Sequence, residues 1–418
     1  MSTATTHIDN KPSLRGTKQS HSLAPALRFK EFEGEWNKKK MSDLSERIGD
    51  GLHGTPKYVD ESDIHFVNGN NLMNGKIFIS DKTKKVGDNT FLKNDKNLAD
   101  NTVLISLNGT IGNIARYNNE KVMLGKSVGY FNFNTASDYY YHILNSPKIQ
   151  RFFISELTGS TIKNLSLKTL RETIIPYPSL PEQQKIATFL SAVDEKIQQL
   201  TQKKALLEDY KKGVMQQLFS STGSGHRSGK LRFKADTSTS LGAGNGNAYP
   251  EWEDALLGDC LKYVQPTKYL VSSTEYDDSF ETPVLTAGKT FVLGYTGEKE
   301  NICTDYPLII FDDFTTASKY VDFPFKAKSS AMKLLLAKEG VDIKFMFEAM
   351  QNIKFEIGGH GRHWISIFSQ LVISVPSIKE QQKIAAYLSS IDTKIEAVKS
   401  QITQTQIFKK GLLQQLFV

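Results

Sequence analysis

The sequence predicts an α+β protein with two mixed α/β units, each built on a twisted sheet and each followed by one long helix. A stretch of forty residues occurs twice, as Leu180–Phe219 and Ile378–Phe417. The two copies align without a gap at an offset of 198 residues, and 18 of 40 positions are identical. The chain before each copy is rich in short alternating apolar runs separated by Asn and Gly, a pattern typical of strands and turns. The repeat therefore indicates two pseudo-equivalent halves.

Each forty-residue copy predicts one long helix. Both copies begin with Ser-x-x-Glu, as Ser179 with Glu182 and Ser377 with Glu380, which is the capping-box signature of a helix start. Apolar residues then recur in 4-3 alternation, the heptad pattern of a helix that pairs in a coiled coil. A lysine interrupts this seam at one matching position in each copy, Lys211 and Lys409. The predicted seam consists of Ile186, Leu190, Val193, Ile197 and Leu200 in the first helix and Ile384, Leu388, Ile391, Ile395 and Val398 in the second.

The order of these features divides the chain into six segments. A short Leu-Arg-Phe-Lys entry followed by Glu-Trp precedes each globular part. A Ser-, Thr-, Gly- and Asn-rich stretch after the first helix has the composition of a flexible linker. The predicted segments are a disordered tail (1–26), a first globular domain (27–178), a first long helix (179–219), a linker (220–248), a second globular domain (249–376) and a second long helix (377–418).

The two globular domains share a plan but not a sequence. Val103–Tyr117 predicts a β-hairpin because Asn108-Gly109 is a strong turn signal, and Tyr139–Leu157 has helical spacing. In the second domain, Leu308–Thr316 and Phe345–Ile353 take the places of this hairpin and helix. The matched strands that lead into the two long helices are Leu170–Pro178 and Phe368–Pro376.

Composition narrows the class of protein. The 418 residues carry a formal net charge of +7, which favours an anionic partner. No apolar run is long enough to span a bilayer, and the polar first 26 residues lack the apolar core of a secretion signal. The two cysteines, Cys260 and Cys303, are not at metal-ligand spacing, so we expect a reducing, cytoplasmic setting with no disulfide framework and no metal site.

The sequence contains no convincing catalytic motif. Gly125-Lys-Ser and Gly288-Lys-Thr resemble the end of a phosphate-binding loop, but Glu120 and Pro283 stand where its first glycine is required. The Asn-Pro-Pro-aromatic motif of adenine methyltransferases is absent. Asp194-Glu-Lys has an acidic spacing seen in nucleases, but its place on a long helix favours a solvated charged face. We therefore expect no catalytic residues and no cofactor bound by this chain.

Basic loop residues beside aromatic or amide side chains are the candidate nucleic-acid contacts. Lysine and arginine supply affinity for phosphate, while Asn, Gln and Arg discriminate between bases in a groove. The glycine-rich loop around His360 and Arg362 is either a flexible polar loop or a contact loop, since glycine permits close backbone approach. The candidates are Lys57, Tyr58, Asn70, Asn71, Lys84, Lys85, Arg116, Lys126, Lys163 and Asn164 in the first domain, and Lys268, Tyr269, Lys289, Lys319, Tyr320, Lys328, His360, Arg362 and His363 in the second.

These features together resemble the specificity subunits of type I restriction–modification enzymes. The resemblance covers nearly the whole chain from Leu27 and is carried by a doubled helix that opens with Glu-Gln-Gln-Lys-Ile-Ala and ends with Lys-Lys-Gly and Gln-Gln-Leu-Phe. The linker at 220–248 is longer than is usual for the family. The matching pieces are Glu182–Ala187, Lys211–Gly213 and Gln216–Phe219, their partners at 380–385, 409–411 and 414–417, and Gly51–Pro56, which is similar to the opening of a target-recognition domain.

The resemblance implies two target-recognition domains joined by an antiparallel helix pair with pseudo-two-fold symmetry. Each domain would read one half of a split, asymmetric DNA site in the major groove, and the helix pair would set the number of unread base pairs. It implies two methyltransferase subunits that use S-adenosylmethionine and two restriction subunits that use ATP and Mg²⁺. Two other classes remain open: a coiled-coil scaffold that joins proteins without binding DNA, and a nuclease or methyltransferase that acts alone.

Overall fold

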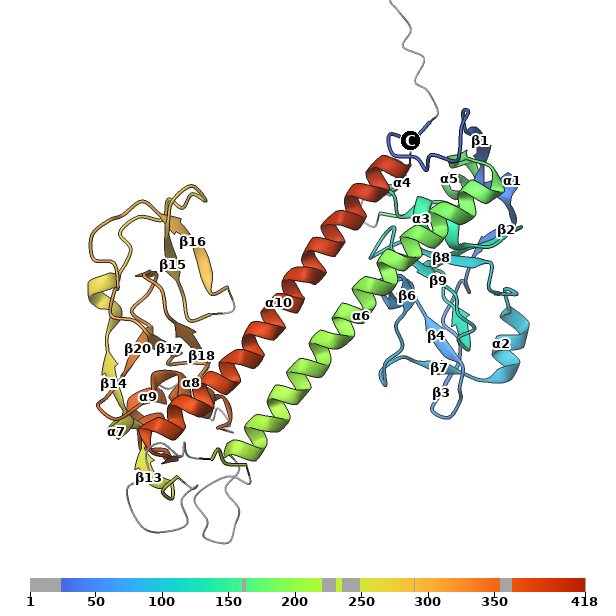
Figure 1. Cartoon of the computed structure of the whole chain (residues 1–418). Helices are drawn as coiled ribbons and strands as arrows, with labels where there is room; N and C mark the ends of the chain where they lie inside the picture. The colour runs from blue at the N-terminus through green and yellow to red at the C-terminus, as the bar shows by residue number, and fades with distance from the viewer. Residues whose placement is uncertain are drawn as a thin grey trace, which may run out of the picture. The chain divides into compact units, whose positions relative to one another are not determined.

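The computed structural model describes residues 24–159, 163–219, 231–234, 249–288, 290–353 and 363–417 (Figure 1). The chain forms two compact units, of which unit 1 combines Met1–Gln199 with Ile402–Val418 and unit 2 is Leu200–Gln401. Both long helices, α6 (Leu180–Phe219) and α10 (Ile378–Leu416), contribute to both units. Unit 1 holds the start of α6 and the end of α10, and unit 2 holds the end of α6 and the start of α10.

An antiparallel four-stranded sheet lies at the centre of the first globular domain, in the order β2-β11-β8-β9. Its strands are β2 (Ser45–Asp50), β8 (Thr102–Ser106), β9 (Ile114–Arg116) and β11 (Val128–Phe133). A second sheet, β10-β4-β7-β3, is mixed because β10 pairs with β4 in parallel. Its strands are β3 (Tyr58–Val59), β4 (His65–Val67), β7 (Lys85–Val86) and β10 (Val122–Leu124). Two two-stranded sheets pair β1 (Asn37–Lys40) with β12 (Ile174–Tyr177) and β5 (Leu72–Met73) with β6 (Lys76–Ile77).

The helical segment predicted as Tyr139–Leu157 is two helices instead of one. It divides into α3 (Asp138–Leu144) and α4 (Pro147–Ser155). The break falls at Ser146, because the preceding residue of a proline is disfavoured in a helix and proline itself suits the first helical position. Ser146 Oγ accepts a hydrogen bond from the amide of Ile149 and caps α4. The other short helices are α1 (Met41–Leu44), α2 (Asp88–Asn94), α5 (Leu167–Glu172) and the 3-10 turn η1 (Gly69–Asn71).

The second globular domain repeats the first domain's central sheet with unlike residues. Its antiparallel sheet has the order β14-β20-β17-β18, which reproduces the chain order of β2-β11-β8-β9 strand for strand. Its strands are β14 (Leu261–Val264), β17 (Leu308–Asp312), β18 (Ser318–Val321) and β20 (Met332–Ala337). The remaining elements among the described residues of this domain are β13 (Glu253–Leu256), α7 (Leu257–Cys260), η3 (Pro266–Tyr269), β15 (Thr282–Leu285), β16 (Val292–Thr296), β19 (Lys326–Ala327), α8 (Ile343–Gln351), α9 (His363–Ser366), η4 (Phe368–Gln370) and β21 (Val372–Val375). The predicted α+β fold with two domains of one plan is confirmed.

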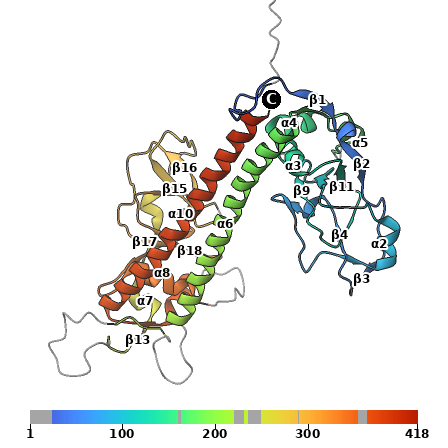
Figure 2. The same cartoon turned by 45° about the vertical axis from the view of Figure 1, so that its right-hand side comes forward.

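The ends of the long helices belong to the hydrophobic cores of the globular domains. In unit 1, Ile186 and Leu190 of α6 pack with Leu416 of α10 and with the aromatic residues of α3. In unit 2, Leu218 of α6 and Leu388 of α10 pack with residues of α7 and α8. Figure 2 shows the start of α6 beside α3 and α4. Since the start of one helix meets the end of the other in each unit, the helices are antiparallel there.

The ten predicted seam residues are all buried or half-buried. Seven of them are buried: Ile186, Leu190, Leu200, Ile384, Leu388, Ile391 and Val398. The other three, Val193, Ile197 and Ile395, are half-buried. The heptad pattern therefore identified the buried face, although near each helix start this face packs against a globular domain as well as against the other helix.

Each long helix begins where Ser-x-x-Glu predicts, but the glutamate has a different partner. Arg28 of the entry segment donates from Nε and Nη2 to the two carboxylate oxygens of Glu182, at 2.8 and 2.9 Å. Arg232 binds Glu380 in the same way, at 3.2 and 2.8 Å. The Ser377 hydroxyl has no hydrogen-bond partner in the part of the chain that the structure describes. The repeated entry motif is thus an arginine clamp on the first turn of each helix.

Within the described residues, no helix combines the length and the hydropathy that a membrane span requires. The two cysteines, Cys260 and Cys303, are free and buried, and burial raises the pKa of both thiols.

The arginine clamp predicts a measurable loss of stability when its carboxylate is neutralised. Glu182 is 2% exposed and Arg28 is 16% exposed, so Glu182→Gln leaves a guanidinium that is largely excluded from water without its counter-ion. We expect the free energy of unfolding to fall by about 2–3 kcal/mol, because breaking a buried charged pair costs more than a surface pair. Urea denaturation measures this loss. Lys204→Met, which breaks an exposed pair with Glu208 on α6, is the control and should change stability by less than about 0.5 kcal/mol. Equal stability of Glu182→Gln and the wild type would contradict the clamp.

Candidate nucleic-acid interface

The mixed sheet of the first globular domain brings four candidate residues together. Lys57 directly precedes β3, and β3 pairs antiparallel with β7, so that Tyr58 faces Val86 and Val59 faces Lys85. Lys57, Tyr58 and Lys84 are exposed, and Lys85 is half-buried. The strand pairing therefore collects lysine ammonium groups and one exposed phenol ring at one edge of this sheet, a combination that suits a phosphate backbone and unstacked or groove-exposed bases.

Two further candidates lie on turns that are hydrogen-bonded to each other. Asn70 is exposed in the η1 turn, and Lys126 is exposed between β10 and β11. The Gly69 amide donates to Ser127 Oγ at 2.9 Å, and the same hydroxyl donates to Asn68 Oδ1 at 3.0 Å. An amide side chain and a lysine are thus presented from a pair of fixed turns, which is the arrangement that positions a base-reading group beside a phosphate-binding group.

In the second domain, strand pairing brings Lys268 and Lys328 to neighbouring segments. Lys268 lies in η3, and the residue that follows η3, Leu270, bridges Ala327 at the end of β19. Lys328 comes directly after Ala327, and both lysines are exposed. Lys319 is exposed on β18, in the other sheet of the domain. The Leu270–Ala327 bridge thus places the segments that carry Lys268 and Lys328 side by side, whereas Lys319 belongs to a different sheet.

Several candidates have partners within the protein. Asn71 accepts from the Asn68 amide at 2.9 Å and donates to the Phe78 carbonyl at 3.0 Å, so its side chain closes its own turn. The buried Tyr269 donates to Asp305 at 2.7 Å. Tyr320 is half-buried with its ring under the Lys344 ammonium, 4.8 Å from the centroid. These side chains shape the loops and surfaces that carry the exposed candidates.

The structure describes only part of the segments around Lys163 and His363. Lys163 is exposed, and the neighbouring Asn164 pairs through its backbone with Thr158 at 2.9 and 3.0 Å. His363 is 4% exposed at the start of α9, and its amide donates to the Asp313 carbonyl at 3.1 Å. Lys289, His360 and Arg362 lie outside the described residues.

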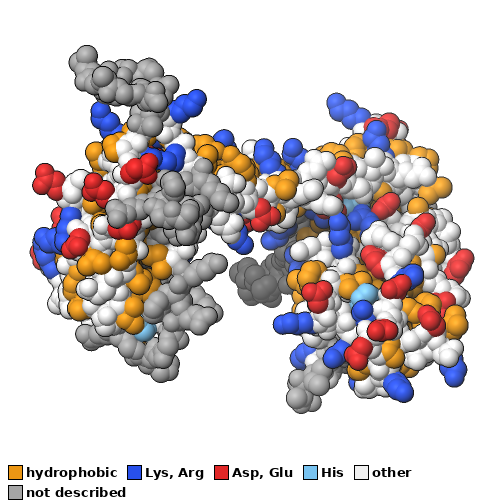
Figure 3. All heavy atoms as spheres, turned by 90° about the horizontal axis from the view of Figure 1, so that it is seen from below, with side chains coloured by type: hydrophobic (Ala, Val, Ile, Leu, Met, Phe, Trp, Pro, Cys, Tyr) orange, Lys and Arg blue, Asp and Glu red, His pale blue; other side chains and the backbone are white. Residues whose placement is uncertain are grey.

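One face of the molecule carries charges of both signs (Figure 3). On the face seen in Figure 3, lysine and arginine side chains are scattered among acidic and hydrophobic ones instead of forming one continuous patch. The described residues contain no group of three or more His, Cys, Asp and Glu side chains arranged to hold a metal ion.

Arg116 connects the first globular domain to α6. Its Nε donates to Asp138 at 2.9 Å, and its Nη2 donates to Ser191 of α6 at 3.2 Å. The guanidinium lies 3.6 Å from the centroid of the Tyr141 ring, and Nη2 is also 3.1 Å from Nε2 of the fully buried His142. The Arg116 side chain therefore helps to position the first globular domain against α6.

The most important polar residues missed by the sequence analysis are Asp194 and Asp392. Asp194 accepts from Lys409 of α10 at 2.5 Å, and Asp392 accepts from Lys211 of α6 at 2.8 Å. Asp194 is 25% exposed, so its interpretation as part of a solvated face was wrong. The available signal was that both aspartates and both seam-breaking lysines recur at the offset of 198.

Comparison with known proteins identifies the family. A family model described as the type I restriction modification DNA specificity domain matches residues 33–209 and 249–405, which is more than half of the chain. Each match covers one globular domain and the greater part of the long helix that follows it. The chain belongs to this family and contains its domain twice.

Individual relatives agree with this assignment. The chain is 48% identical over 141 residues to the EcoR124I/EcoR124II type I restriction enzyme specificity subunit of Escherichia coli, a match that covers 32% of this chain and 35% of that protein. It is 24% identical over 304 residues to the MjaVIII specificity subunit of Methanocaldococcus jannaschii, covering 65% of this chain and 68% of the relative. The first of these matches thus spans about a third of the relative's length. The crystal structure of a type I restriction-modification S subunit from M. genitalium has the same fold, with a TM-score of 0.62, 18% identity, and coverage of 94% of this chain and 99% of that one.

The burial of His142 beside Arg116 leads us to expect that the folded chain loses stability in mild acid. Burial, followed by the charges of Arg116 and Lys409, holds the pKa of His142 well below its usual 6.5. The unfolded chain therefore binds more protons than the folded one below about pH 6.5, and stability falls as the pH is lowered, by up to about 1.4 kcal/mol per pH unit. His142→Gln removes the titrating group and should flatten this part of the profile. Chemical denaturation between pH 8 and pH 5 measures it, and identical profiles for the two proteins would contradict the assignment.

Proposed function

We propose that this chain is the DNA-sequence specificity subunit of a type I restriction–modification complex. Each globular domain reads one half of a bipartite, asymmetric site in the major groove, and the helix pair fixes the number of unread base pairs between the halves. The observation that carries this proposal is the duplication of a DNA specificity domain: two copies share the strand order of the central sheet and differ in the residues that their loops expose.

The difference between the domains supports an asymmetric target. The first domain exposes Lys57 with Tyr58 at one sheet edge and Asn70 with Lys126 on paired turns, whereas the second exposes Lys268 and Lys328 beside η3. One scaffold with two sets of surface side chains favours reading two different half-sites, because sequence is read by the side chains at base edges while the scaffold and phosphate contacts set the position.

The same proposal assigns the chemistry to partner subunits. Two methyltransferase subunits would use S-adenosylmethionine to methylate adenine N6 within the site, and two restriction subunits would use ATP and Mg²⁺. The chain itself would be non-catalytic and would bind double-stranded DNA and these subunits. The repeated end of the first long helix leaves Lys212 and Gln216 exposed beside the buried Leu218, so these polar positions are candidates for docking a partner.

DNA binding separates this function from a coiled-coil scaffold. The chain with its methyltransferase partner should bind target duplex with an affinity that falls steeply with salt, because phosphate contacts release counter-ions. Alanine at Lys57, Lys84 and Lys126 together should weaken binding at least tenfold on every sequence and reduce the salt slope by about three. Alanine at the exposed Lys30, Lys93 and Lys121 is the matched control for charge. Fluorescence anisotropy at several salt concentrations measures both effects.

Two results would reject the proposed function. Binding that depends neither on salt nor on DNA sequence would favour the scaffold. Methylation or cleavage by the purified chain alone, incubated with DNA and labelled S-adenosylmethionine, would show an enzyme that acts without partners.

A further inference from the structure

We propose that Asp194 and Asp392 are positioning residues that join each recognition domain to the helix pair in one orientation. Each aspartate receives one cation from the opposite helix and one from the globular domain of its own unit. The consequence for DNA reading rests on the proposed function, while the positioning role can be measured without DNA.

In unit 1, three segments meet at Asp194 of α6. Lys409 of α10 contacts its Oδ1 at 2.5 Å, and Arg116 of β9 approaches its Oδ2 at 3.9 Å. The Arg116 guanidinium also donates to Ser191, one turn earlier on α6. The side chains of Asp194, Lys409 and Arg116 are 25%, 18% and 21% exposed. This is a partly desolvated node that includes both helices and the domain.

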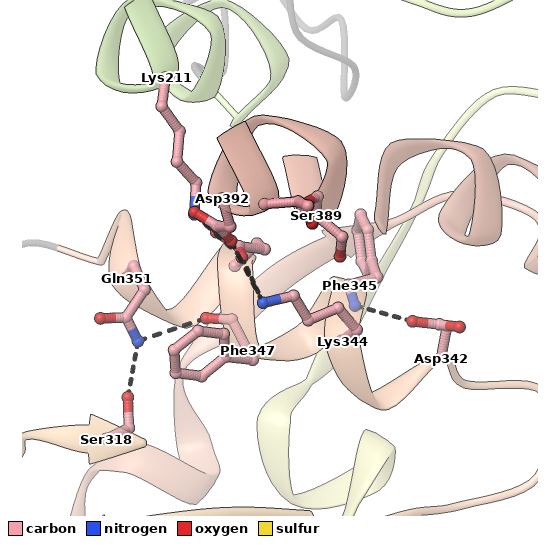
Figure 4. A network of polar contacts seen from close by, with 11 residues as sticks. Lys211, Ser318, Asp342, Lys344, Phe345, Phe347, Gln351, Ser389 and Asp392 are labelled. Carbon is pink, nitrogen blue, oxygen red and sulfur yellow. Dashed lines mark hydrogen bonds and ion pairs between the residues drawn. The ribbon is translucent and has the colours of Figure 1, made fainter. Parts of the chain in front are cut away.

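In unit 2, the same kind of node forms around Asp392 of α10 (Figure 4). Lys211 of α6 donates to both carboxylate oxygens, at 2.8 and 2.9 Å. Lys344 of α8 reaches Oδ2 at 3.4 Å. The fully buried Glu348 of α8 contacts both lysines, at 2.9 Å from Lys211 and 3.0 Å from Lys344. Again the two helices and the globular domain meet at one aspartate.

The two nodes share their helical residues and differ in the residue from the domain. Asp194 and Asp392 are related by the offset of 198, as are Lys211 and Lys409. The cation from the domain is Arg116 on a strand in one unit and Lys344 on a helix in the other. The same chemistry is thus supplied to equivalent aspartates by non-equivalent parts of two diverged domains, which indicates a requirement at the aspartate itself.

Stability alone does not account for these nodes. Each lysine interrupts an apolar seam, and a buried ion pair is often no more stabilising than well-packed apolar residues of similar size. A polar residue in a helix seam instead selects one register and one partner arrangement, since every shifted arrangement leaves a charge unpaired. Because the node also includes a cation of the domain, the selected arrangement includes the orientation of the domain on the helices.

The test replaces one node by apolar residues and measures orientation directly. In Lys211→Leu with Asp392→Leu, the protein should melt within a few degrees of the wild type. Nitroxide labels at Lys319 on β18 and Lys212 on α6, both exposed residues of unit 2, report the distance between domain and helix by pulsed electron paramagnetic resonance. We expect a single narrow distance distribution in the wild type and a broadened or shifted one in the variant. An unchanged distribution in a folded variant would overturn the proposal.

In a methylation assay, the variant of each node serves as the control for the variant of the other node. The quantity compared is the methylation rate on DNA mismatched in one half-site, divided by the rate on matched DNA. In the full complex, this ratio should be at least tenfold higher for the unit 2 variant, Lys211→Leu with Asp392→Leu, than for the wild type. Lys409→Leu with Asp194→Leu should relax the other half-site instead. Relaxation of both half-sites by either variant would overturn independent positioning. A changed distance with unchanged discrimination would keep the positioning role and reject its consequence for DNA reading, whereas a wild-type complex without any discrimination would reject the proposed function itself.

If the double leucine variant of unit 2 does not fold, a conservative variant tests the same proposal. Asp392→Glu keeps the charge and lengthens the side chain by one methylene, so the node should persist with a displaced domain. We expect a shifted but still narrow distance distribution. A distribution identical to that of the wild type would count against the proposal in the same way.

Discussion

Neither globular domain has a complete core without the ends of both long helices. In unit 1 the aromatic ring of Phe417 lies 5.8 Å from that of Tyr139, and in unit 2 the equivalent Phe219 lies 5.7 Å from Phe345. Burial of such rings and of the leucines beside them removes a large apolar area from water. Because the start of one helix and the end of the other are both needed in each unit, every domain depends on a helix that also serves the other half of the chain.

Charged side chains then determine how these apolar surfaces pair. Hydrophobic burial is roughly proportional to area and has little directional preference, so a heptad seam alone tolerates neighbouring registers. The Arg28–Glu182 and Arg232–Glu380 clamps fix the entry of each domain at a helix start. The aspartate nodes fix a second point 12 residues, or slightly more than three helical turns, further along. A domain held at two points on a rigid helix has a defined orientation, and the proposed reading of base edges requires such an orientation.

The periodicity of the sequence predicted the architecture well because it reflects burial. The seam residues, the two helix starts and the repeated strand plan all follow from patterns of apolar residues and turn signals. The partners of charged residues were not predictable in the same way. Asp194 and Arg116 are far apart in the chain, and nothing local shows that a strand end will meet a helix. For Tyr139–Leu157, the helical spacing was correct, but the weight of Pro147 as a helix boundary was underestimated.

For the candidate contact residues, the sequence predicted surface exposure more reliably than it predicted which side chains are available to a ligand. Lysines beside aromatic residues were placed at the surface in most cases, as at Lys57 and Lys268. Asn71 and Tyr269 instead make internal hydrogen bonds. A single sequence does not distinguish a polar side chain that closes a turn from one that faces a ligand, because both favour the same residue types in the same loops.

We propose that the two domains read two half-sites and that the helices set the gap between them. The most direct measurement is single-molecule sequencing of methylated adenines in a host that carries this chain with its partners, compared with a chain that has one heptad inserted in each helix between its aspartate and its lysine. We expect a split, asymmetric motif for the unchanged chain. For the lengthened chain we expect the same half-sites with a gap about three base pairs longer, since seven helical residues add roughly 10 Å. Altered half-sites with an unchanged gap, or a continuous motif, would contradict it.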